Sequence, residues 1–181
     1  MIHLFLATGF EEIEALATLD VLRRCNLEVS TVSITGTRLI HGAHGIPIMA
    51  DTLLRKSEID NSECLILPGG MPGARNLCAC DSLRRALQQH NKKGTLIAAI
   101  CAAPMVLGEL GILQGKNATC YPGFEEYLKG AVCVKDLVVK DGNIITAKGP
   151  GATWDFAFKI AEHFVPVQRI KQLKSDHLLK E

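Results

Sequence analysis

The sequence predicts an α/β domain with a doubly wound, mostly parallel β-sheet that is covered by helices on both faces. Apolar runs of strand length, such as Ile2–Ala7 and Leu96–Ile100, alternate along the chain with segments of helical periodicity. Continuous apolar runs are typical of strands buried on both faces, and their alternation with helices predicts βαβ units. The length of 181 residues and the 48% hydrophobic content fit one globular domain over residues 1–181.

The first half of the chain begins with a predicted strand and a predicted helix. The helix places Ile13, Leu16, Leu19 and Leu22 on one stripe, which we expect to face the sheet. The expected elements are a strand over Ile2–Ala7, a helix over Glu11–Cys25, a strand over Val29–Ile34, a hairpin or short edge strands within Leu39–Ala50, and a strand over Cys64–Leu67.

The second half continues the alternation, and its Asp141-Gly142 step is a hairpin signal. The expected strands are Leu96–Ile100, Ala118–Tyr121, Leu137–Val139 and Ile144–Ala147. The expected helices are Ala74–Leu77, Ser82–Asn91, Ala102–Leu113, Ala152–Phe164 and Val167–Leu173.

Composition and charge exclude several classes of function. The formal net charge is +1 and aromatic residues are few, so nucleic-acid binding is not expected. The longest stretch without a formal charge, Thr95–Gly108, is too short to span a bilayer, and the first residues lack signal-peptide features. The seven cysteines show no metal-binding spacing. We therefore expect a cytoplasmic protein with reduced thiols, no membrane segment, no metal and no cofactor.

Three segments that follow predicted strands carry the residues of chemical interest. They are Gly9–Glu14, the turn Pro68-Gly69-Gly70, and Cys101. In an open parallel sheet, ligands bind beyond the carboxyl ends of the strands, where the strand order reverses. We therefore expect these three segments to meet in one crevice.

Cys101 is the predicted nucleophile. It lies between the strand Leu96–Ile100 and Pro104, and proline favours the first turn of a helix. The thiol therefore falls on a tight strand-to-helix turn of the nucleophile-elbow kind, although the usual flanking glycines are absent. A helix N-terminus is expected to lower the thiol pKa. The alternative is a small buried cysteine, which is our interpretation of Cys25, Cys64 and Cys133.

Glu14 is the predicted acid–base partner of Cys101. Glu11 and Glu12 are explained by the preference for acidic residues in a first helical turn. Glu14 lies one turn further, close to the end of the first strand. If it faces Cys101, thiol and carboxyl compete for one proton and their pKa values separate, so a protonated Glu14 can serve a thiolate.

Several neighbouring residues are candidates for binding substrate. The backbone N–H groups of Gly69, Gly70 and Ala102 are expected to hold an oxyanion, and Tyr121 with Cys120 is expected to line the crevice. Gly149-Pro150-Gly151 is either a helix start or a segment that closes over the pocket. Cys78-Ala79-Cys80 lacks a second thiol pair, so a structural role is favoured over a redox or metal role.

The motifs Leu67-Pro68-Gly69-Gly70 and Ala98-Ala99-Ile100-Cys101-Ala102-Ala103-Pro104 resemble the ThiJ/PfpI superfamily. Glu11-Glu12-Ile13-Glu14 and Lys148-Gly149-Pro150-Gly151 are similar to segments of its DJ-one branch, the type of the Parkinson's-disease-associated deglycase. The resemblance covers essentially the whole chain. It implies a flavodoxin-like fold, related to class I glutamine amidotransferases, and a homodimer with the site near the dimer interface.

The resemblance also implies the residue roles: an oxidation-sensitive nucleophile at Cys101, a protonated partner at Glu14, and oxyanion binding by Gly70 and Ala102. Two departures matter. Tyr121 stands where many relatives have a histidine, so a Cys–His dyad is not expected, and Ala102 replaces the histidine of the protease-like branch.

The expected function is that of a glutathione-independent glyoxalase or deglycase acting on methylglyoxal-type reactive carbonyls or early glycation adducts, and not that of a peptidase. The alternatives are an oxidative-stress sensor that works through oxidation of Cys101, and a non-catalytic chaperone.

Overall fold

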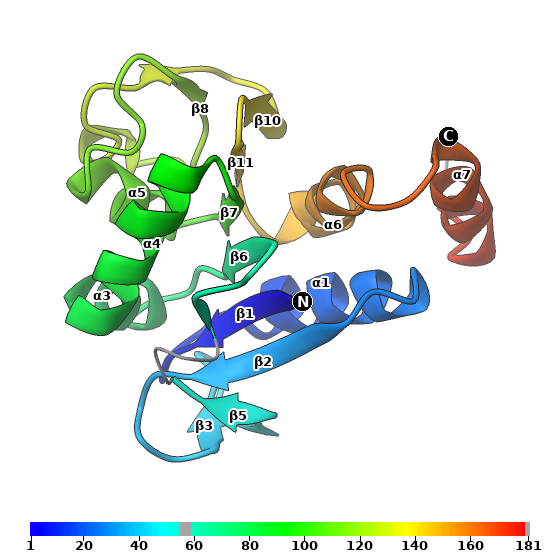
Figure 1. Ribbon diagram of the computed structural model, residues 1–181, viewed down its shortest axis with the longest axis horizontal. Coiled ribbons are helices and arrows are strands. Elements are labelled where there is room, and N and C mark those ends of the chain that lie inside the picture. Colours follow the sequence, from blue (N-terminus) through cyan, green and yellow to red (C-terminus); the bar gives the residue numbers. More distant parts are fainter. Residues whose placement is uncertain (55–58, 180–181) are drawn as a thin grey trace.

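The computed structural model describes residues 1–54 and 59–179. Within these residues, seven strands form a central sheet in the order β10-β11-β7-β6-β1-β2-β5 (Figure 1). All neighbouring strands are parallel except β10 and β11, which form an antiparallel hairpin. The strands are β1 (Ile2–Leu6), β2 (Val29–Ser33), β5 (Thr52–Leu53), β6 (Cys64–Leu67), β7 (Leu96–Ile100), β10 (Val138–Asp141) and β11 (Ile144–Ala147).

Helices cover both faces of this sheet, which confirms the predicted fold class. Helices α1 and α6 pack on each other and cover one face, while α3, α4 and α5 cover the other (Figure 1). The described helices are α1 (Glu12–Arg24), α3 (Gly73–Ala79), α4 (Asp81–Lys93), α5 (Pro104–Glu109), α6 (Thr153–Ala161) and α7 (Val167–Asp176).

The core is built on the three central strands. Every residue of β1, β6 and β7 is buried, as the continuous apolar runs predict for strands enclosed between two helical layers. The predicted apolar stripe of α1 is partly wrong, because Ile13 is 55% exposed and Leu22 alone of the stripe is fully buried. Glu14 and Thr18 lie on the buried face of α1, so the apolar stripe lies beside that face rather than on it.

Some predicted elements differ from the observed ones. The strand expected over Ala118–Tyr121 is reduced to β8 (Asn117–Ala118), which pairs with β9 (Val132–Cys133) in a separate small sheet. The helix expected over Ala102–Leu113 is limited to α5, since Gly111 and Gly115 follow it with positive φ angles. The expected hairpin within Leu39–Ala50 is confirmed by the antiparallel pair β3 (Leu39–His41) and β4 (Pro47–Met49).

The search for membrane spans covered the described residues. None of the helices in this part of the chain combines the length and the apolar character needed to cross a membrane.

Candidate active site

The candidate site lies at the carboxyl ends of three adjacent strands. Glu14 is in the first turn of α1, which follows β1; Gly69 and Gly70 follow β6; Cys101 follows β7. From β1 the chain builds the sheet outward through β2 and β5, and later on the opposite side through β6 and β7. The site therefore lies where the strand order reverses, as expected for a ligand-binding crevice in such a sheet.

Cys101 occupies a strained turn. Its φ angle is 64°, in the left-handed region that side-chain-bearing residues rarely adopt. The turn is held by two backbone hydrogen bonds, from Cys101 N–H to the Ala147 carbonyl at 2.8 Å and from Tyr121 N–H to the Cys101 carbonyl at 2.9 Å. Cys101 therefore lies on a tight strand-to-helix turn, as predicted.

The sulfur of Cys101 is surrounded by backbone rather than by bulky side chains. The N–H groups of Gly70 and Ala102 donate hydrogen bonds to it. A Cβ atom on Gly69 would lie 2.6 Å from Cys101 Cβ and 2.8 Å from Glu14 Oε2, so only glycine fits between these two side chains. Two of the three donors predicted for an oxyanion, Gly70 and Ala102, therefore face the Cys101 sulfur, whereas Gly69 N–H donates to Glu14 Oε2 instead.

Glu14 is fixed in place by backbone hydrogen bonds. Its side chain is 1% exposed, and Oε2 accepts a hydrogen bond from Gly69 N–H at 2.8 Å. Its own backbone N–H donates to Glu11 Oε2 at 2.7 Å, so Glu11 is the N-cap that orients Glu14. The carboxyl also forms a weak hydrogen bond with the Cys101 thiol, yet Oε1 has no well-aligned partner in the described part of the chain.

Burial and proximity change the pKa values of both groups. Burial raises the pKa of Glu14 to about 7, against the opposing hydrogen bond from Gly69. Burial and the Glu14 carboxylate raise the pKa of the Cys101 thiol to about 12, although the Gly70 and Ala102 N–H groups favour the thiolate. The predicted lowering of the thiol pKa is wrong. Helix α5 begins three residues beyond Cys101 and is six residues long, so its dipole does not offset burial.

The two groups titrate as a pair. A proton on Glu14 removes the negative charge that opposes ionisation of Cys101, so a carboxylate with a thiol can exchange for a carboxylic acid with a thiolate. A pair that carries one mobile proton can both attack a carbonyl carbon and move a proton on the product of that attack.

Tyr121 and Gly149 form one wall of the site. The Tyr121 side chain is exposed, and its ring lies over Gly149: a Cβ on Gly149 would be 3.1 Å from Tyr121 Cδ2 and 4.0 Å from Cys101 Sγ. From the sequence, Gly149 belongs either to a helix start or to a segment that closes over the pocket. Gly149 was not among the predicted site residues. In the structure it both precedes the 3₁₀ turn Pro150–Ala152 and adjoins the thiol.

One set of potential metal ligands occurs among the described residues. Ligand atoms of Glu11, Glu12 and His44 lie within 4.8 Å of one another. Both Glu12 oxygens bind His44, at 2.7 Å to its backbone N–H and 2.7 Å to its Nδ1. Burial acts to raise the pKa of Glu12, but these hydrogen bonds outweigh it and hold that pKa below its usual value. The cluster joins the hairpin of β3 and β4 to α1.

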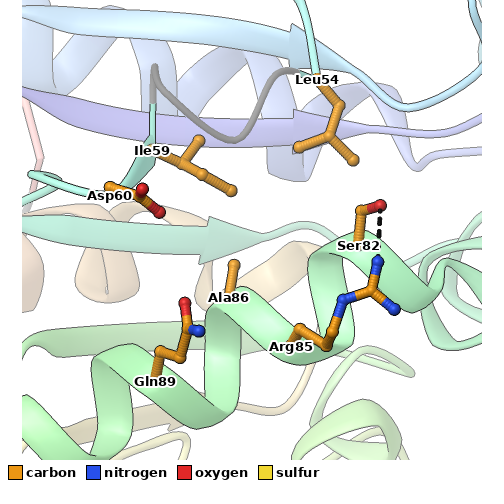
Figure 2. A pocket seen from close by; sticks show the side chains of 7 residues that line it. All are labelled: Leu54, Ile59, Asp60, Ser82, Arg85, Ala86 and Gln89. Atoms are coloured by element: carbon orange, nitrogen blue, oxygen red, sulfur yellow. Dashed lines mark hydrogen bonds between the residues drawn. The ribbon is translucent and has the colours of Figure 1, made fainter.

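Two other features lie away from Cys101. Cys78 and Cys80 are half-buried, and the Arg84 guanidinium donates to Cys78 Sγ at 3.7 Å and to the Cys78 carbonyl at 3.2 Å, which fits the structural role expected for this pair. A cavity of about 160 Å³ lies beside α4, between Leu54, Ile59, Arg85 and Gln89 (Figure 2). None of its lining residues belongs to the Cys101 site.

Comparison with known proteins gives one consistent family. Residues 1–163 match the DJ-1/PfpI family. Protein dj-1beta of Drosophila melanogaster is 36% identical over 93% of this chain and 91% of its own length. Glutathione-independent glyoxalase DJR-1.2 of Caenorhabditis elegans is 36% identical over 84% of this chain and 81% of its own length.

Protein DJ-1 homolog A of Arabidopsis thaliana is 39% identical over 97% of this chain. The chain spans only 45% of that relative, less than half its length. Among solved structures, oxidised Toxoplasma gondii DJ-1 has a TM-score of 0.93 and 33% identity, with 99% of this chain and 98% of that chain covered. The crystal structure of Drosophila melanogaster DJ-1beta has a TM-score of 0.92 and 34% identity, with 99% and 98% covered. The flavodoxin-like fold that the resemblance implies is therefore confirmed.

Replacing Gly69 tests the close packing around Cys101 and Glu14. The Cβ of Gly69→Ala would force apart the Cys101 and Glu14 side chains, and we expect a loss of about 1–3 kcal/mol in the free energy of unfolding. The control is Gly151→Ala, where an added Cβ meets no atom within 4 Å. Urea denaturation of both variants measures the difference, and equal stability of the two would contradict the packing described here.

The raised pKa of Glu14 predicts a pH-dependent stability. Between its usual value near 4.5 and about 7, the unfolded carboxyl is ionised while the folded one still holds its proton. The free energy of unfolding therefore falls as pH rises through this window. The full decrease, on the order of 3 kcal/mol, is reached above pH 7. Glu14→Gln removes this loss, so its stability relative to the natural protein should rise from pH 5 to pH 8.

Thr18→Val is the matched control for this experiment, because Thr18 is another buried polar residue of α1 and neither the threonine nor the valine side chain titrates, so the effect of this change on stability should not vary with pH. Denaturant unfolding at pH 5, 6, 7 and 8 gives the comparison. A Glu14→Gln difference that does not change with pH would show that the Glu14 carboxyl is not protonated in this window.

Proposed function

The chain belongs to the DJ-1/PfpI family and to its DJ-1 branch, and from this premise we propose that it is a glutathione-independent glyoxalase. The observation that carries the proposal is the buried contact of the Cys101 thiol with the Glu14 carboxyl beneath two backbone N–H donors. The name of the Caenorhabditis elegans relative supports the same activity.

The first step of the proposed reaction is addition of Cys101 to the aldehyde carbon of methylglyoxal. As the C–S bond forms, the carbonyl π electrons move to oxygen, and the Gly70 and Ala102 N–H groups stabilise that oxyanion. The thiol proton passes to the Glu14 carboxylate and from there to the oxyanion, which gives a hemithioacetal. Glu14 is then ionised again and ready to act as a base.

The second step is an isomerisation. Glu14 removes the proton from the hemithioacetal carbon, and the electron pair moves toward the neighbouring ketone oxygen, which forms an enediolate. The hydroxyl proton of the hemithioacetal moves to that oxygen and Glu14 returns its proton to the former ketone carbon, which leaves a thioester on Cys101 and a hydroxyl group beside it. Water hydrolyses the thioester to lactate and restores the thiol, so one methylglyoxal and one water give one lactate. Cys101 supplies the thiol that glutathione supplies in glutathione-dependent enzymes.

Deglycase activity would differ in its first step. Cys101 would bond to the hemiaminal or hemithioacetal carbon of an early methylglyoxal adduct as the amine or thiol of the adduct leaves with the thiol proton, passed on by Glu14. The hemithioacetal on Cys101 would then follow the same isomerisation and hydrolysis. Tyr121 is exposed and stands beside the thiol, so it would contact the larger part of such a substrate.

Oxidation sensing at Cys101 is the second candidate function, because one structurally similar relative is described as oxidised. Two equivalents of a peroxide convert a thiolate into a sulfinate and release two waters. The Gly70 and Ala102 N–H groups that would hold an oxyanion can equally hold sulfinate oxygens.

We also propose that the protein is a cytoplasmic homodimer. All seven cysteines lie in the described residues and are free thiols, which suits a reducing compartment. Exposed apolar side chains occur on α1, at Ile13, and on the β3–β4 hairpin, at the paired residues Leu39 and Met49. The hairpin is attached to the start of α1 by the Glu12–His44 pair and by the hydrogen bond from Ala43 N–H to the Phe10 carbonyl. A second copy is the proposed partner of this surface.

The glyoxalase proposal predicts how turnover depends on Cys101 and Glu14. Lactate formation from methylglyoxal without glutathione should fall at least ~1,000-fold in Cys101→Ser and about 100- to 10,000-fold in Glu14→Gln. Turnover of the natural protein should increase with pH through about 7, as Glu14 becomes the basic form. Cys78→Ser, a change at a half-buried thiol outside the site, is the control and should retain full activity.

Either of two results would reject the glyoxalase proposal: full turnover in Glu14→Gln, or no turnover in the natural protein. The second result would transfer the assignment to oxidation sensing at Cys101.

The dimer proposal predicts that Met49→Asp yields a monomer. Met49 is 60% exposed, and a carboxylate placed there would be desolvated within the proposed interface. Light scattering after size exclusion should show the molar mass halved. Val167→Asp, at a 61% exposed position on α7, is the control and should remain dimeric. A dimer of unchanged stability in Met49→Asp would exclude this surface.

A further inference from the structure

Two thiols outside the Cys101 site line a single cavity. Cys120 and Cys133 both face a cavity of about 230 Å³, together with Glu125, Lys135 and Lys148. Both cysteines are free thiols. Neither takes part in the proposed reaction of Cys101. The prediction of a small buried cysteine is wrong for Cys133, whose side chain is exposed. Cys120, expected to line the crevice of Cys101, lines this cavity.

Strand register makes the two cysteines near neighbours. Strands β8 and β9 are parallel, and Ala118 is the partner of Cys133. Cys120 lies two residues beyond Ala118, just past the end of β8, and lines the same cavity as Cys133. With a strand spacing of about 4.8 Å and a rise of about 3.3 Å per residue, the Cα atoms of Cys120 and Cys133 are on the order of 8 Å apart. A disulfide needs a separation below about 7 Å, so a bridge requires a movement on the order of 1 Å.

The movement is assigned to the Cys133 side of the small sheet. Cys120 is held by hydrogen bonds of its neighbours, from Thr119 N–H to Thr146 Oγ1 at 3.0 Å and from Tyr121 N–H to the Cys101 carbonyl at 2.9 Å. Cys133 lies at the end of the two-residue strand β9. Cys133 is exposed, so solvent oxidants reach it directly, whereas Cys120 is 4% exposed.

The charges around Cys120 also reflect the proximity of the second thiol. Burial raises the pKa of Cys120 to about 12, and the charges of Glu125 and Cys133 add to this effect. Lys148 acts in the opposite direction and favours the thiolate of Cys120. Cys133 is therefore the thiol that a dissolved oxidant reaches first, and Cys120 is the thiol that then attacks the oxidised sulfur of Cys133.

We propose that Cys120 and Cys133 form a reversible disulfide when the protein meets a peroxide. The Cys133 thiolate attacks one peroxide oxygen, the O–O bond breaks, and Cys133 sulfenic acid forms with release of hydroxide or alkoxide. Cys120 sulfur then attacks the sulfenyl sulfur, and the S–S bond forms as hydroxide leaves and takes up the Cys120 proton. With hydrogen peroxide, two thiols and one peroxide give one disulfide and two waters.

The disulfide would close the loop of residues 121–132 next to the nucleophile. Cys120 directly precedes Tyr121, whose N–H donates to the Cys101 carbonyl. The proposal does not depend on the glyoxalase assignment, because the bridge forms whether or not Cys101 turns over a substrate.

Peptide mapping under non-reducing conditions tests the proposal. Trypsin separates the three relevant thiols into Asn117–Lys129 with Cys120, a short peptide of residues 130–135 with Cys133, and residues 94–116 with Cys101. After titration of the folded protein with hydrogen peroxide and alkylation of remaining thiols, we expect a linked species of the first two peptides. Its mass should be two hydrogen atoms below their sum, and dithiothreitol should abolish it.

Three variants make the result specific. Cys101→Ser should form the linked species as the natural protein does, whereas Cys120→Ser and Cys133→Ser should not. Cys133 is exposed, so its replacement leaves the fold intact. The melting temperature of the natural protein and of Cys101→Ser should rise by several degrees after peroxide treatment, and that of Cys133→Ser should not. A link between the Cys101 and Cys120 peptides, or oxidation of Cys133 without any link, would overturn the proposal.

Discussion

Burial of the Glu14 carboxyl opposes its ionisation and raises its pKa, and the chemistry of the site depends on this effect. The carboxyl is held between Gly69 N–H and the Cys101 thiol, with almost no exposure to water. A carboxylate with an ordinary pKa would be a weak base toward the thiol. Burial raises the pKa of Glu14 to about 7 and makes its carboxylate a stronger base, while the raised pKa of Cys101, about 12, keeps the proton on the thiol until substrate arrives. These shifts need a tight backbone enclosure, which the ends of β1, β6 and β7 provide.

The sequence predicted the sheet and the convergence of the site well, because these depend on strong local signals. Continuous apolar runs in β1, β6 and β7 identify strands enclosed on both faces, and the parallel order brings their carboxyl ends together. The turn at Cys101 could be located because Pro104 marks the start of the next helix. Short elements such as β5 and β9 were missed, since two residues carry no periodicity.

The direction of the pKa shift of Cys101 and the contacts between residues distant in sequence could not be predicted from local sequence patterns. The expected lowering of the thiol pKa rested on a helix dipole, but the degree of burial and the nearby carboxylate decide its direction. Glu12 was interpreted as a dipole residue, whereas its actual partner is His44, which is 32 residues away in the sequence. The proximity of Gly149 to Cys101 arises from the pairing of β11 with β7. Such contacts depend on tertiary register, which no local pattern encodes.

The two glycines that flank the thiol limit how this protein could be redesigned. At Gly69 any side chain would collide with Cys101 and Glu14, and a Cβ at Gly149 would lie 3.1 Å from Cδ2 of the Tyr121 ring and 4.0 Å from Cys101 Sγ. Libraries at these positions would mostly yield misfolded or blocked proteins. Tyr121 is 46% exposed and contributes only its backbone to the turn, so its side chain can vary without loss of the elbow. Under the glyoxalase proposal, selectivity for larger aldehydes should thus be engineered, and should diverge naturally, at residue 121.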